Sequence, residues 1–122
     1  MQIRSAETAG FCFGVERAVS LAEQTAKSCA SAVTLGPIIH NRHVVERFEA
    51  MGLREIARAE DAQPGQTVVI RAHGIPVCEQ QTLAARRAKL VDATCPFVKK
   101  IHVIARQAEE AGRHLLIIGT PT

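Results

Sequence analysis

The chain has 122 residues, of which 47% are hydrophobic, and this is enough apolar material for one compact domain with a buried core. Its 15 lysines and arginines against 12 acidic residues give a formal charge of +3, and the basic residues are scattered over predicted helix surfaces. This pattern argues against nucleic-acid binding, and the longest apolar run, "LLII" at 115–118, is too short to span a bilayer. With no apolar secretory segment near the start, we expect a cytoplasmic protein that does not bind membranes.

Short β-branched runs alternate with helical patterns along the chain, which is typical of an α/β fold with a parallel-type sheet and flanking helices. In chain order, the sequence predicts a strand at 1–5, a helix at 15–26, a strand at 33–35, and a helix at 41–51 that ends before Gly52. It then predicts a buried strand at 67–70, a helix from Pro76, a strand at 90–93, a helix from Pro96 to about 111, and a strand at 114–118.

One cysteine or histidine, close to Gly or Pro, follows each of four predicted strands: Cys12, His40, His73 and Cys95. In a parallel sheet these junctions lie at the carboxyl ends of the strands, which is where ligands bind. The helix N-termini at such junctions also offer free N–H groups to a thiolate or a phosphate. Four such side chains at one edge of a sheet favour a functional site.

The residue types at this edge allow two kinds of metal centre. One is a tetrahedral zinc site with Cys12, His40, His73 and Cys95 as ligands, as in a zinc-dependent hydrolase. The other is an iron–sulfur cluster on the two cysteines, with the histidines left to hold an anion. The spacing does not choose between them, and a non-catalytic binding lobe without metal is a third interpretation.

The remaining cysteines and histidines are assigned structural roles. Cys29 and Cys78 are expected to be small buried hydrophobic residues on helix faces. His43, His102 and His114 are expected to have structural or solvated roles.

Four motifs, "GFCFGVERA", "HNRHVVERF", "RAHGIP" and "DATCPFVKKIH", in this order and at these intervals, resemble the N-terminal part of the 4-hydroxy-3-methylbut-2-enyl diphosphate reductase family. The resemblance implies an oxygen-sensitive 4Fe-4S cluster held by three cysteines. Cys12 and Cys95 match the first two, and the third is expected beyond Thr122. The resemblance also implies that His40 and His73 contact the diphosphate of the allylic substrate.

The family performs the last step of the non-mevalonate isoprenoid pathway. Two electrons from ferredoxin or flavodoxin remove the substrate's hydroxyl as water, giving isopentenyl and dimethylallyl diphosphate. A third histidine and a proton-relay glutamate are expected past the chain end, so no catalytic residue is assigned here. The resemblance implies a three-lobed α/β assembly, with residues 1–95 as the first lobe and 96–122 as a truncated second, and the chain alone is expected to be inactive. Phe11, Phe13 and Phe97 are expected to shield the cluster or to lie in the core.

Overall fold

A four-stranded parallel sheet forms the centre of the computed structural model, which describes residues 1–7 and 9–118. The strand order is β2-β1-β3-β4. The strands are β1 (Val33–Leu35), β2 (Arg54–Ile56), β3 (Thr67–Ile70) and β4 (Lys89–Asp92). The helices are α1 (Phe13–Ser28), α2 (Arg42–Ala50), α3 (Val77–Ala85) and α4 (Pro96–Glu110), with a short 3-10 helix η1 (Ala59–Asp61). The predicted α/β class with a parallel sheet is confirmed.

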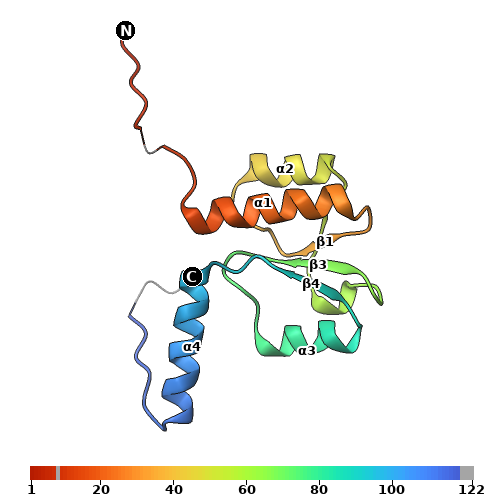
Figure 1. Ribbon diagram of the computed structural model, residues 1–122, viewed down its shortest axis with the longest axis vertical. Coiled ribbons are helices and arrows are strands. Elements are labelled where there is room, and N and C mark those ends of the chain that lie inside the picture. The colour runs from red at the N-terminus through yellow and green to blue at the C-terminus, as the bar shows by residue number, and fades with distance from the viewer. Residues whose placement is uncertain (8, 119–122) are drawn as a thin grey trace.

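Helices cover both faces of this sheet: α1 and α2 lie on one face and α3 on the other (Figure 1). Successive residues of a strand point to opposite faces, so β3 contributes side chains to the core on both sides of the sheet. Val68 and Ile70 pack with Leu83 of α3, whereas Val69 packs with Phe48 of α2. The short apolar run of β3 is therefore buried from both sides, as its sequence predicts.

The sheet has a topological switch point between β1 and β3. These strands are hydrogen-bonded neighbours, but the chain leaves β1 toward α2 on one face and leaves β3 toward α3 on the other. In open parallel sheets, connections that diverge in this way leave a crevice outside the carboxyl ends of the two strands, and ligands bind there.

Local signals in the sequence account for the helix boundaries. Asn41 caps α2, where its side-chain oxygen accepts a hydrogen bond from the Val44 N–H at 3.3 Å. Gly52 follows the helix with φ +84°, a backbone conformation that favours glycine. The helix α3 begins directly after Pro76, and α4 begins at Pro96. The strands at 33–35 and 67–70 have the predicted bounds.

Two of the predicted strands are wrong and one strand was missed. Residues 1–5 are exposed and extend away from the body of the molecule, and residues 114–118 are also exposed; neither segment belongs to the described sheet (Figure 1). An extended segment becomes a strand only when a neighbouring backbone pairs with its N–H and C=O groups. The missed strand β2 lies at a sheet edge and is mostly exposed, so its sequence "REI" has no apolar run. Among the described residues, no helix has the length and apolar character needed to cross a membrane.

Candidate functional site

His40 and His73 meet at the switch point. His40 lies in the loop that follows β1, and His73 lies in the loop that follows β3. Their imidazole rings are stacked, with centroids 5.9 Å apart and an interplanar angle of 14°. The Ala72 N–H donates a hydrogen bond of 3.4 Å to the Ile38 carbonyl and so joins the two loops. The structure therefore brings together two histidines that the sequence placed at separate junctions.

The electrostatic environment of His73 suits a site for an anion. Partial burial lowers the pKa of His73, and the positive charges of Arg71 and His40 lower that pKa further. His73 therefore releases its proton more readily than a free imidazole does. A bound anion would offset the neighbouring positive charge and favour proton uptake by this imidazole.

Cys12 and Cys95 each precede the first turn of a helix. Cys12 is the N-cap of α1 and Cys95 is the N-cap of α4, and both thiols are free. A Cβ added to Gly14 would lie 2.4 Å from the Cys95 sulfur. The Cys95 sulfur therefore lies directly against the first turn of α1, which Cys12 precedes. Helix N-termini of this kind have unpaired N–H groups, which favour a bound anion.

Two aromatic rings join the same helix ends. Phe13, next to Cys12, and Phe97, close to Cys95, are in edge-to-face contact with ring centroids 6.5 Å apart. Their exposed fractions are 61% and 69%, and Phe11 is also exposed, so the prediction of a core role for these phenylalanines is wrong. The contact places apolar surface beside the two cysteines.

Arg17 is a supporting residue that the sequence analysis did not single out. Its guanidinium donates a hydrogen bond of 3.3 Å to the Thr94 carbonyl, directly before Cys95. The Cys95 N–H donates to the Ala72 carbonyl at 2.8 Å. The motif "GVERA" could have indicated this role, because Arg17 is three residues after Gly14 and so lies on the same helix face.

The junction that precedes Cys95 is also held by an ion pair. Asp92 accepts a hydrogen bond of 2.9 Å from the Thr94 N–H and pairs with Lys99 at 2.5 Å. Burial raises the pKa of Asp92, but the hydrogen bonds from Lys99 and Thr94 outweigh this effect and keep the pKa below its usual value. The carboxylate therefore stays charged, and its contacts with Thr94 and Lys99 stabilise the start of α4.

The structure does not gather the four predicted ligands around one ion: His40 and His73 are stacked, and Cys95 lies against the helix turn that follows Cys12. Across residues 1–7 and 9–118, no three His, Cys, Asp or Glu side chains are grouped closely enough to hold a metal ion. The tetrahedral zinc site thus has no ligand set in this part of the chain. The residues present do fit an iron–sulfur cluster in part, because two free thiols lie at adjoining helix N-termini and Gly14 leaves room for one of them.

The other cysteines and histidines differ in how well they match their predicted roles. Cys78 is exposed, so the prediction that it is buried is wrong. Cys29 is half-buried against the core, and a hydrogen bond with the Thr67 hydroxyl, at 3.5 Å, lowers the pKa of its thiol. His43 and His114 are exposed, as a solvated role predicts. The structure also contradicts the idea that every corner residue follows a strand, because no strand precedes Cys12 in the described chain.

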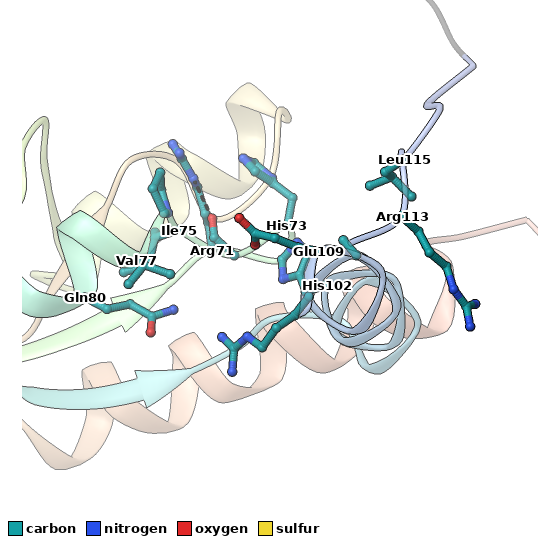
Figure 2. A pocket seen from close by; sticks show the side chains of 13 residues that line it. Arg71, His73, Ile75, Val77, Gln80, His102, Glu109, Arg113 and Leu115 are labelled. Carbon is teal, nitrogen blue, oxygen red and sulfur yellow. Dashed lines mark hydrogen bonds between the residues drawn. The ribbon is translucent and has the colours of Figure 1, made fainter. Parts of the chain in front are cut away.

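A basic pocket of about 860 Å³ adjoins the histidine pair, between the loop after β3 and α4 (Figure 2). Its titratable lining residues are three arginines, two histidines and one glutamate: Arg71, Arg106, Arg113, His73, His102 and Glu109. Such a lining suits an anionic ligand.

Comparison with known proteins gives consistent matches. The profile of a family described as LytB protein matches residues 3–122. A 4-hydroxy-3-methylbut-2-enyl diphosphate reductase of Aquifex aeolicus is 44% identical over 93% of this chain and 39% of its own length. One of Oleidesulfovibrio alaskensis is 48% identical over 98% of this chain and 43% of its own length.

Two solved structures share this fold. One is (E)-4-hydroxy-3-methyl-but-2-enyl diphosphate reductase, described as the terminal enzyme of the non-mevalonate pathway, with a TM-score of 0.74 and 46% identity over 88% of this chain and 38% of that one. The other is E-1-hydroxy-2-methyl-but-2-enyl-4-diphosphate reductase from Plasmodium falciparum, with a TM-score of 0.79 and 30% identity over 86% of this chain and 33% of that one. The chain spans about two fifths of the length of the curated relatives it matches.

Proposed function

The chain belongs to the LytB protein family, and from this premise we propose that it is the N-terminal part of a 4-hydroxy-3-methylbut-2-enyl diphosphate reductase. The reaction would remove the hydroxyl of the allylic diphosphate reductively and give isopentenyl and dimethylallyl diphosphate. The observation that carries the proposal is the linkage at Ala72, whose N–H bonds to the loop of His40 and whose carbonyl accepts from Cys95. One short segment of backbone thus joins the loops of the histidine pair to Cys95.

Cys12 and Cys95 would hold a 4Fe-4S cluster, with a third cysteine from a part of the protein beyond these residues. When bound by three thiolates, such a cluster supplies electrons and one iron free to act as a Lewis acid toward the substrate's hydroxyl. The N–H groups at the starts of α1 and α4 support this assignment because they favour the negative charge of the thiolates and cluster. Phe13 and Phe97 would exclude water on one side of the sulfurs.

His40 and His73 would bind the diphosphate. Burial, Arg71 and His40 lower the pKa of His73. A bound diphosphate would raise that pKa again, and a protonated ring would donate a charge-assisted hydrogen bond from each nitrogen. The two rings are stacked with centroids 5.9 Å apart, so both imidazoles could contact one group with several oxygens. Fixing the diphosphate here orients the allylic end of the substrate, and orientation of this kind lowers the entropic part of the barrier.

The division into lobes remains part of the proposal, with residues 1–95 as the first lobe and 96–122 as the start of a second. Support comes from α4, which has no buried residue and exposes Phe97, Ile101 and Ile104. Residues 119–122 lie outside the described residues. With ferredoxin or flavodoxin as the electron donor in the cytoplasm, the complete protein would turn over substrate, whereas the chain of 122 residues would not.

Anaerobic reconstitution of the complete protein with iron and sulfide, followed by visible absorption and iron analysis, tests the cysteine assignment. We expect Cys12→Ser and Cys95→Ser to lose the cluster bands, and Cys78→Ser, a matched change at an exposed cysteine, to retain them. If both site variants keep a full complement of iron, the assignment is wrong. Histidine variants, described below, test the diphosphate site separately.

A further inference from the structure

Arg71 lies between the loops that present the two histidines. Its Nε donates a hydrogen bond of 3.2 Å to the Gly74 carbonyl, next to His73. On its other side, Nη1 lies 2.7 Å from the position that a Cβ of Gly36 would occupy, so the guanidinium packs against the backbone where the loop of His40 begins. One half-buried side chain thus contacts both loops.

Both glycines are required by this arrangement. Gly36 and Gly74 have φ +69° and +82°, and a side chain at Gly36 would occupy the space of the guanidinium. The Arg71 carbonyl also accepts a hydrogen bond of 3.0 Å from the Gly74 N–H. The main chain and the side chain of Arg71 therefore hold the same turn, and the side chain extends that support to the neighbouring loop.

We propose that Arg71 is a positioning residue that holds the His40 and His73 loops at the spacing required to bind a diphosphate. This inference rests on the proposed function, because it assigns a role through the histidines. The role requires the guanidinium itself and not only its charge. A lysine ammonium cannot supply a donor at the place of Nε while another nitrogen packs against Gly36, since its charge is a single point at the end of a flexible chain.

The test measures binding of inorganic pyrophosphate to the complete, cluster-loaded protein by calorimetry, together with the imidazole NMR signals of His40 and His73 without ligand. We expect Arg71→Gln to weaken binding about tenfold, in line with the loss of a hydrogen bond from a charged group, and to shift both sets of signals. Arg71→Lys is expected to weaken binding to a similar extent. With substrate, the KM should rise more than kcat falls.

Arg86→Gln is the matched control, because the Arg86 guanidinium also donates to a backbone carbonyl, that of Ala62, at 2.9 Å, but away from the histidines. We expect its pyrophosphate affinity to equal that of the unaltered protein. Gly36→Ala is a second test, to be used if Arg71→Gln does not fold. This variant retains Arg71 but displaces its guanidinium, and we expect it to weaken pyrophosphate binding.

The outcomes separate the two proposals. If His40→Ala and His73→Ala lose binding but the Arg71 and Gly36 variants bind normally, the role of Arg71 is overturned and the diphosphate site stands. Restoration of full affinity by Arg71→Lys would also overturn it, because charge alone would then be sufficient. If the histidine variants bind pyrophosphate as well as the unaltered protein does, the proposed diphosphate site is itself wrong.

Discussion

Replacing Gly14 with alanine tests the approach of α1 to Cys95 with a single methyl group. The added Cβ would lie 2.4 Å from the Cys95 sulfur and 2.9 Å from the Cys95 Cβ. Comfortable contacts between heavy atoms lie at about 3.5–4.0 Å, so the helix and the cysteine must separate by roughly an ångström. We therefore expect Gly14→Ala to displace the sulfur that the proposed cluster requires.

The effect on folding is the difference between two opposing terms. Overpacking of this kind costs about 1–3 kcal/mol. Alanine in place of glycine in a helix contributes about 1 kcal/mol in the other direction. The free energy of unfolding should therefore fall by only about 0–2 kcal/mol. Metal–sulfur distances tolerate changes of only about 0.2 Å, so the shift of the sulfur should reduce iron loading far more clearly than it reduces stability.

The assay combines urea unfolding with iron content after anaerobic reconstitution of the complete protein. Ser20→Ala, an exposed change on the same helix, provides the control for helix propensity and should load iron fully. In a Cys95→Ala background the stability cost of Gly14→Ala should shrink, because the nearest atom is then absent. A Gly14→Ala protein that is more stable than the unaltered one and holds a full complement of iron would refute the close approach.

Three further predictions concern the core, a helix cap and the histidine pair. Phe48 is only 3% exposed, so Phe48→Ala should lower the free energy of unfolding by about 3–5 kcal/mol in urea titrations, and a loss below about 1 kcal/mol would contradict its place in the core. Asn41→Ala should cost about 1 kcal/mol by removing the cap of α2, whereas Asn41→Ser should retain most of the stability. His73 should titrate by NMR with a midpoint below the usual value of about 6.5, and pyrophosphate should raise that midpoint. Because the unfolded chain then binds a proton more readily than the folded one, stability should fall as the pH drops from about 6.5 through the folded pKa, and His73→Asn should flatten this dependence. A midpoint at or above 6.5 would show that Arg71 and burial do not act on this ring as described.

Much of the local structure could be predicted because its causes lie within a few residues. The apolar run of β3, the side-chain cap at Asn41 and the proline at the start of α4 each determine a boundary without help from the rest of the chain. The candidate site residues could be proposed from the sequence for a similar reason, because cysteine and histidine beside glycine or proline are typical of chain junctions. The resemblance through four motifs added the family, and the comparisons agree with it.

Strand pairing followed from the tertiary structure alone. The residues 1–5 and 114–118 look like strands by composition but lack a partner in the described sheet, whereas "REI" becomes β2 because β1 offers it a free edge. Hydrogen bonds between strands join residues far apart in sequence, so the composition of one segment cannot determine whether they form.

The sequence by itself determined the α/β class and most helix limits, and it singled out Cys12, His40, His73 and Cys95 as candidate site residues. Only the tertiary structure decided that His40 and His73 form a pair, because the divergence of the chain at β1 and β3 brings their loops together. It alone brought Gly14 against Cys95 and Arg71 against Gly36. These contacts depend on the crossing of helices and loops over a sheet, and no periodicity or motif along a single segment records that geometry.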